Sequence, residues 1–278
     1  MDNKILLLNL LCALFLACTH GSLENQDKLY IEMLDVGQGL SFLIKSKDCN
    51  SLYDTGTPNS GLDTMLQNRD IKTLCSVVLS HRHNDHTGGI ATLAKMAKNG
   101  EIRIKRVIYA SDSAEEPFIT LLNEAGIETQ EISRGDTLAD FLPWTTRILF
   151  PVKNSSLTEN AASIAMRLSD SQNSFLFMGD LEAPQEKSIL ELEPLLSATA
   201  LQTGHHGSKT SSSWDFLAQI QPKMAFISAG KNNSYGHPHP ETLAKLRLIL
   251  QDSTQIFRTD TDGSVELEWV YRVGMWSR

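Results

Sequence analysis

Three histidines and an aspartate stand close together in residues 80–89, which read SHRHNDHTGG. His81 and His83 are two residues apart, so both can leave the end of a strand on the same side and chelate one metal ion. Asp85 and His86 lie further on and can reach a second ion. A patch of solvated surface histidines is the alternative, but this spacing is a specific pattern. The segment therefore predicts a metal site.

Two further segments place polar side chains directly after apolar strands. Residues 175–180 (FLFMGD) end in Asp180, a carboxylate that could bridge two cations about 3.5–4 Å apart. Residues 203–208 (TGHHGS) carry His205 and His206. One of these histidines could complete the metal coordination while the other faces the substrate as a proton donor. The pattern does not decide which histidine ligates the metal.

The segments after these histidines offer groups for a phosphate. The loop GSKTS at 207–211 supplies backbone amides, the Ser208 hydroxyl and the Lys209 ammonium, which together predict a phosphate cradle. His237 lies in the Pro-rich turn YGHPHP. It could contact a phosphate or simply pack beside Tyr235. We therefore treat Ser208, Lys209 and His237 as candidate substrate-binding residues.

The elements that must position these residues come in two alternating groups. Short strands come first and are followed by strands that alternate with helices, and the same order then repeats. This order predicts an α/β protein of two halves, with the sheets face to face and the helices outside. The strands expected nearest the motifs and the chain end are Ser76–Ser80, Ser174–Met178, Ala198–Gln202, Met224–Ser228 and Ser264–Trp269.

Composition sets limits on the class of protein. The chain has 278 residues, of which 41% are hydrophobic and 21% charged, as in an ordinary folded protein large enough for a closed core. Its formal net charge of −8 argues against a broad basic face for nucleic acid, although a local basic patch is still compatible.

The first residues have the pattern of an export signal. An apolar run from Ile5 to Ala17 is too short to span a bilayer but fits a signal-peptide core, so we predict a signal peptide over residues 1–17. A buried N-terminal helix is the alternative. The sequence FLAC at 15–18 resembles a lipobox, which would make Cys18 a lipid anchor. If Cys18 is a plain thiol, the product is secreted or periplasmic and soluble.

Cys49 and Cys75 follow the leader. Cys75 falls in an apolar strand and reads as a small core residue, whereas Cys49 falls in a turn. Their spacing does not require them to pair, and neither has metal-site spacing.

Several stretches resemble the metallo-β-lactamase superfamily, namely 54–56 (DTG), 81–86, 179–180 and 205–206. Others resemble the soluble hydrolase domain of ComEC-type competence proteins, namely 34–39 (LDVGQG), 203–208, 235–240 and 258–263 (RTDTDG). The resemblance covers roughly residues 28–268. It implies a single-domain, four-layer αββα sandwich. We place this domain at 28–270, between a linker at 18–27 and a tail at 271–278.

The same resemblance implies a site for two divalent ions, Zn²⁺ or Mn²⁺. The first ion would be held by His81, His83 and Asp180. The second would be held by Asp85, His86, Asp180 and His206. Asp85 and His205 would be the catalytic residues, with His205 as general acid. Asp54 would orient the ligands, and Asn160 stands where many members have a further histidine ligand.

The resemblance implies a hydrolase in which a metal-bridged hydroxide attacks a phosphodiester, and the leader at residues 1–17 predicts that this hydrolase is exported. Nucleic acid is the leading substrate, in a nuclease reaction, with single-stranded DNA as the candidate form. Alternatives are a phosphodiester of the cell envelope, such as a phosphocholine ester, a β-lactam or other acyl substrate, and a non-catalytic, metal-stabilised binding protein. No obligate protein partner is expected, and only the Cys18 anchor would contact the membrane.

Overall fold

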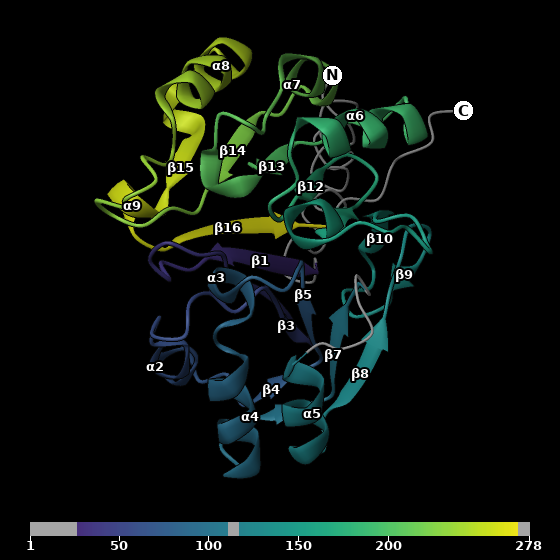
Figure 1. Cartoon of the computed structure of the whole chain (residues 1–278), viewed down its shortest axis with the longest axis vertical. Helices are drawn as coiled ribbons and strands as arrows, with labels where there is room; N and C mark the ends of the chain where they lie inside the picture. The colour runs from purple at the N-terminus through teal and green to yellow at the C-terminus, as the bar shows by residue number, and fades with distance from the viewer. Residues whose placement is uncertain (1–26, 111–116, 272–278) are drawn as a thin grey trace, which may run out of the picture.

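The chain forms two large sheets that pack face to face with helices outside (Figure 1). The computed structural model describes residues 27–110 and 117–271, and within these ranges each large sheet has seven strands. The predicted leader and Cys18 lie outside the described residues, as do the linker and tail apart from Asp27 and Tyr271. The α/β sandwich predicted from the sequence is confirmed.

The first sheet is built mainly by the N-terminal half. Its strands run in the order β16 (Val265–Val270), β1 (Lys28–Met33), β2 (Phe42–Ser46), β3 (Asn50–Tyr53), β5 (Ser76–Leu79), β7 (Arg106–Tyr109) and β8 (Glu128–Glu131). A separate two-stranded sheet joins β4 (Thr73–Leu74) and β6 (Arg103–Ile104). The strand predicted at 264–269 is thus β16, which pairs antiparallel with β1 rather than joining the second sheet.

The second sheet is built by the C-terminal half. Its order is β15 (Ile256–Arg258), β14 (Met224–Ile227), β13 (Ala200–Gln202), β12 (Ser174–Phe177), β11 (Ala165–Ser169), β10 (Thr145–Phe150) and β9 (Thr137–Leu138). Strands β12, β13, β14 and β15 are parallel, so their carboxyl ends share one edge. The predicted strands at 174–178, 198–202 and 224–228 agree with β12, β13 and β14 to within two residues at either end.

Helices cover the outer face of each sheet. The first sheet carries α2 (Leu62–Asn68), α4 (Ile90–Lys98) and α5 (Pro117–Glu124), and the second carries α6 (Ala183–Leu192), α7 (Trp214–Ile220) and α8 (Pro240–Leu250). The short helices are α3 (Asn84–Thr87), α9 (Thr259–Asp262), η1 (Glu159–Ala162), η2 (His205–Gly207) and η3 (Ser253–Gln255). In α4 the buried side chains Ile90, Leu93 and Ala94 recur at helical spacing, which explains why this segment packs as an amphipathic helix.

Aromatic side chains fill the space between the sheets. Phe42 on β2 packs edge-to-face against Phe175 and Phe177 on β12, with ring centroids 5.6 and 5.3 Å apart. All three rings are fully buried. Burial of such large apolar side chains stabilises the sandwich and fixes how the two sheets align.

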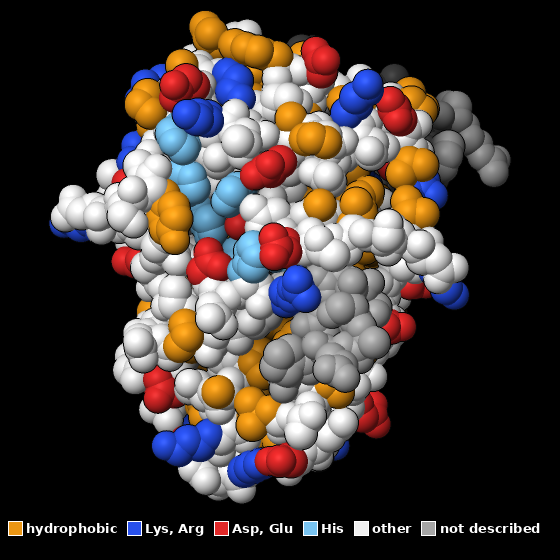
Figure 2. Space-filling model, viewed as in Figure 1, with side chains coloured by type: hydrophobic (Ala, Val, Ile, Leu, Met, Phe, Trp, Pro, Cys, Tyr) orange, Lys and Arg blue, Asp and Glu red, His pale blue; other side chains and the backbone are white. Residues whose placement is uncertain are grey.

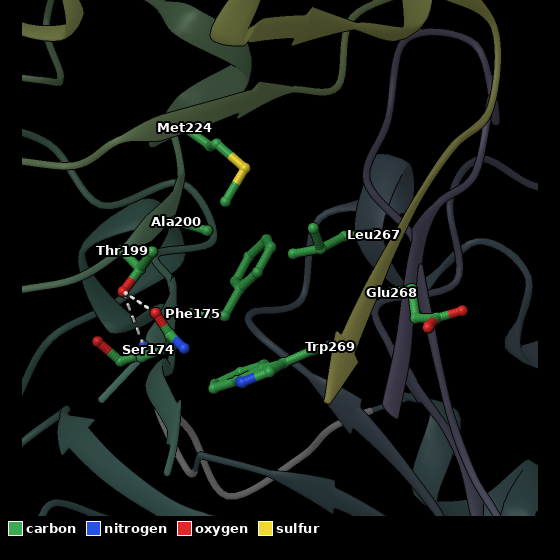
Figure 3. A pocket seen from close by; sticks show the side chains of 9 residues that line it. Ser174, Phe175, Thr199, Ala200, Met224, Leu267, Glu268 and Trp269 are labelled. Atoms are coloured by element: carbon green, nitrogen blue, oxygen red, sulfur yellow. Dashed lines mark hydrogen bonds between the residues drawn. The ribbon is translucent and has the colours of Figure 1, made fainter. Parts of the chain in front are cut away.

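An apolar cavity of about 150 Å³ lies between the sheets, lined by Phe175, Met224, Leu267 and Trp269 among others (Figure 3). It lies where β12, β13 and β14 begin. The predicted site residues follow the ends of β12 and β13, so the cavity is at the opposite edge of the sandwich.

Cys49 and Cys75 form a disulfide, with their Cα atoms 5.8 Å apart. Cys49 comes directly before β3 and Cys75 directly before β5. These strands are parallel neighbours, which brings together two cysteines whose spacing alone did not require pairing.

Candidate metal centre

The predicted site residues meet at the edge where strands of both sheets end. His81 and His83 follow β5, and Asp180 follows β12 after Met178 and Gly179. His205 and His206 follow β13. On the molecular surface, histidines form a line with acidic side chains beside them (Figure 2).

Four side chains converge on one point. Asp85, His86, Asp180 and His206 each offer a ligand atom within 4.8 Å of the others. Asp180 Oδ2 lies 3.2 Å from His86 Nε2 and 3.5 Å from His206 Nε2. Asp85 Oδ2 lies 3.2 Å from His206 Nε2. Imidazole nitrogens and carboxylate oxygens at such distances form a set that suits a divalent transition metal.

Hydrogen bonds behind the cluster orient the two histidine rings. His86 Nδ1 lies 2.8 Å from Asp54 Oδ2. The Ser80 amide and hydroxyl each donate to Asp54 at 2.7 Å. His206 Nδ1 lies 2.8 Å from the Ser228 carbonyl oxygen. Because both Nδ1 atoms are engaged, both Nε2 atoms face the cluster, as ligating histidines require.

His81 and His83 lie beside this cluster. The centroid of the His81 ring is 4.6 Å from that of His83 and 4.2 Å from that of His86. His81 Nδ1 lies 3.2 Å from the Ser163 hydroxyl, and that same hydroxyl oxygen accepts a hydrogen bond from the Asp180 amide. Ser163 therefore forms hydrogen bonds with both His81 and Asp180, which are predicted to bind the same ion.

Several ligand atoms are buried and make no hydrogen bond in the described part of the chain. His81 Nε2, His86 Nε2 and Asp180 Oδ1 make no hydrogen bond within residues 27–110 and 117–271. A buried polar atom without a partner is costly, and three in one cluster need an explanation. A bound cation would satisfy all three, so the residues present fit a metal site.

The charges within the cluster shift several pKa values. Burial alone would raise the pKa of Asp180, but the adjacent His86 and His206 hold it well below its usual range. Burial, and then the charge of His86, lower the pKa of His81 well below its usual range. The Asp180 carboxylate and the neutral His81 ring are the forms that bind metal ions.

The backbone takes unusual conformations around these ligands. Asp54, His205 and His206 have φ values of 61°, 49° and 54°, in the left-handed region that L-residues rarely adopt. Such strain is concentrated at functional sites, where the surrounding structure must hold it in place. Gly179 also has a positive φ of 53°, and a Cβ there would lie 2.9 Å from the Cβ atoms of Ser163 and Ser80.

His205 faces the cluster from one side with a partner that the sequence analysis missed. Its Nε2 lies 3.9 Å from Asp180 Oδ2, and its Nδ1 lies 2.9 Å from Glu182 Oε1. Glu182 also accepts a hydrogen bond from the Thr210 hydroxyl. Glu182 could have been identified as a candidate site residue from its position in the sequence, two residues after the Gly-Asp turn.

The predicted phosphate cradle has most of its groups already bonded. The amides of the loop 207–211 all donate within the protein, including Lys209 N to His239 Nδ1 at 3.1 Å. The Ser208 hydroxyl is buried and lies 2.9 Å from that of Thr210. Lys209 and Thr210 are the residues of this loop that are exposed to solvent.

His237 lies beside the metal cluster, whereas Asn160 belongs to a short helix. The His237 ring lies parallel to that of His206, with centroids 6.1 Å apart. Burial, and then the charges of His206 and His205, lower the pKa of His237 to about 4. Asn160 lies in η1, and its Oδ1 is buried with no partner among the described residues.

Residues 34–231 match the Metallo-beta-lactamase superfamily. ComE operon protein 3 of Bacillus subtilis (strain 168) is 31% identical over 271 residues, which cover 89% of this chain and 34% of that protein. Competence protein ComA of Neisseria gonorrhoeae is 29% identical over 245 residues, which cover 87% of this chain and 32% of that protein. The chain therefore spans about a third of the length of these curated relatives.

A solved structure shares the fold. The metallo-beta-lactamase fold protein YhfI from Bacillus subtilis superposes with a TM-score of 0.63 and 15% identity, covering 88% of this chain and 100% of that chain. Within the described part of this chain, no helix is long and apolar enough to cross a membrane.

Proposed function

Because the chain belongs to the metallo-beta-lactamase superfamily, we propose that it is a metal-dependent phosphodiesterase, and specifically a nuclease that cuts single-stranded DNA. The observation that carries the hydrolase assignment is the convergence of Asp85, His86, Asp180 and His206, with buried ligand atoms that have no other partner in the described chain. The choice of DNA is supported by the likeness to competence proteins.

We assign two ion positions to the site. Asp85, His86, Asp180 and His206 would hold one ion, and His81, His83 and Asp180 the other, with Zn²⁺ or Mn²⁺ as the candidates. Two divalent ions here would activate water as a nucleophile and stabilise the negative charge that develops on the phosphate. The hydrogen bonds of Asp54 with His86 and of Ser163 with His81 would fix the orientation of these two ligand rings.

His205 is suited to proton transfer rather than to ligation. Glu182 accepts a hydrogen bond from its Nδ1, which leaves Nε2 directed at the cluster. We assign the protonated His205 ring as the donor to the leaving oxygen, and Glu182 as the residue that positions and stabilises that ring. His237 and the Lys209 ammonium would contact the phosphate from the rim.

Export is part of the proposal. The leader at 1–17 and the possible lipid anchor at Cys18 would carry the domain to the cell envelope or beyond. The Cys49–Cys75 disulfide supports an oxidising compartment, because disulfides persist there and are rare in the cytosol. One second candidate substrate is a phosphodiester of the cell envelope, which an exported enzyme would encounter. The net charge of −8 also favours it over DNA, because an acidic chain has little general attraction for long polyanions.

The test is metal-dependent cleavage by the full chain. We expect the protein loaded with Mn²⁺ or Zn²⁺ to shorten an end-labelled single-stranded DNA, and Asp85→Asn to lose this activity. Asp48→Asn is the matched control, because Asp48 is exposed in the turn between β2 and β3. Two bound ions without DNA cleavage would reject the nuclease assignment and direct the search to envelope phosphodiesters. Nitrocefin turnover would instead indicate a β-lactamase.

A further inference from the structure

We propose that Tyr235 forms a base-stacking subsite, in which its exposed ring supports a base of single-stranded nucleic acid next to the scissile phosphodiester. The inference deepens the proposed nuclease function and rests on it. Tyr235 belongs to the YGHPHP turn, and nothing in the metal cluster or in proton transfer requires it.

Three aromatic rings form a stack that leads from the metal ligands to the surface. The His206 ring, which faces Asp85 and Asp180, lies 6.1 Å from the His237 ring at an interplanar angle of 25°. The His237 ring lies 5.7 Å from the Tyr235 ring at 22°. Tyr235 is 65% exposed, so the outer end of the stack is open to solvent. A planar group placed there would extend the stack.

The turn that carries Tyr235 is held in place by hydrogen bonds. Asn233 Oδ1 accepts from the amides of Tyr235 and His237, and its Nδ2 donates to the carbonyl oxygens of Gly230 and His237. The Gly230 amide donates to the Gln38 side chain, which lies in the connection between β1 and β2. An exposed aromatic ring on a fixed turn loses little freedom when a ligand stacks on it. A turn built in this way is suited to binding a rigid, planar ligand.

The charge around the site favours stacking as the main source of affinity. Lys209 and Lys231 are exposed. The Arg258 guanidinium, by contrast, is engaged by both oxygens of Asp260 at 3.0 and 2.6 Å. With a net charge of −8, the chain as a whole has little electrostatic attraction for a phosphate backbone. Stacking on a base requires no positive charge and tolerates any base sequence. A single-stranded nucleic acid, whose bases are accessible, fits this surface better than a duplex.

The experiment separates base contacts from phosphate contacts. The full-length protein carrying Asp85→Asn is titrated with a fluorescein-labelled oligothymidylate, and with an abasic strand of equal length and equal phosphate number. We expect tighter binding of the thymidine strand. Adding Tyr235→Ala should weaken that binding by about 5- to 100-fold and leave the abasic strand unchanged. Tyr235→Phe should keep the preference, because it keeps the ring.

Trp214→Ala is the matched control, since Trp214 is also an exposed aromatic residue, at 51%, but lies at the start of α7. Its loss should not change either affinity. Equal binding of the two strands by the Asp85→Asn protein, or no effect of Tyr235→Ala, would overturn the stacking subsite even if the wild type cleaves DNA. Tyr235-dependent preference without cleavage would support the subsite and reject the nuclease. Absence of both binding and cleavage would overturn both proposals.

Discussion

Asp54 Oδ2 lies 2.8 Å from His86 Nδ1, and both side chains are completely buried beneath the cluster. Burial raises the pKa of Asp54, and His86 and Ser80 offset part of that rise by favouring the carboxylate. This pair has no contact with solvent, so its role is to set the direction of the His86 ring.

We predict that Asp54→Asn weakens binding of Zn²⁺ or Mn²⁺ by about 10- to 100-fold, because the His86 ring loses its anionic partner. Competition with a metal-chelating dye measures the affinity, and circular dichroism checks the fold. Asp48→Asn should bind metal as the wild type does. Unchanged affinity in Asp54→Asn would show that the pair serves stability only.

Loss of the proton donor should depend on the leaving group. We predict that His205→Ala lowers kcat on DNA by about 10²- to 10⁴-fold, and that Glu182→Gln lowers it in the same direction by less. Both losses should shrink on a p-nitrophenyl phosphodiester, whose leaving oxygen needs no proton. Metal content, measured alongside, should stay unchanged. An equal loss on both substrates would contradict the role assigned to His205.

Gly179→Ala should be costly for two reasons. The residue has a positive φ, and its Cβ would meet Ser163 and Ser80 at 2.9 Å. We predict a loss of about 2–4 kcal/mol in the free energy of unfolding, measured in urea. Gly126→Ala is the control, since Gly126 also has a positive φ but no atom within 4 Å of the added carbon. That variant should lose only about 1 kcal/mol.

The ion pair of Glu32 with Arg69 predicts a pH dependence of stability. Burial would raise the pKa of Glu32, but Arg69 and Lys45 outweigh it and lower the pKa below the ordinary value of a glutamate. The pair therefore stabilises the fold fully above about pH 5, and this contribution is lost as the pH falls through the lowered pKa. Glu32→Gln should cost about 1–3 kcal/mol at pH 7 and progressively less below pH 4.5. A difference that is the same at pH 7 and pH 3 would contradict this account.

The disulfide should stabilise the first sheet measurably. Cys49 and Cys75 are 26 residues apart. Breaking a disulfide that closes a loop of that size lowers the free energy of unfolding by about 3 kcal/mol. We predict that Cys75→Ser and the reduced wild type lose similar amounts of stability in urea. Titration of thiols in the oxidised, denatured protein should find neither Cys49 nor Cys75 free.

The predictable parts of this molecule were local in sequence. The histidine motif, the strand before it and the Gly-Asp turn each lie within ten residues, so spacing and hydrophobicity were enough to find them. The grouping of Asp85 with His206, 121 residues later, came from family resemblance rather than from pattern.

The contacts that were missed depend on how distant segments meet. Ser163 reaches His81 across 82 positions, and Glu182 reaches His205 across 23. Serine and glutamate are common surface residues, so the sequence pattern does not identify either of them as a site residue before the fold is known. The Cys49–Cys75 pair was left open for the same reason, because only the parallel pairing of β3 with β5 brings the two thiols together. The amides of the loop 207–211 were expected to bind phosphate, but they are bonded within the protein.

The pairing of β16 with β1 has a consequence for how the protein is made. Residues 265–270 are synthesised more than 230 positions after Lys28–Met33, yet they supply the hydrogen bonds along one whole side of that strand. Until they emerge from the ribosome, β1 is an open edge that carries Leu29, Ile31 and Met33, and such edges recruit other chains. A chain truncated before residue 265 would therefore leave this edge of β1 exposed and prone to pairing with other chains.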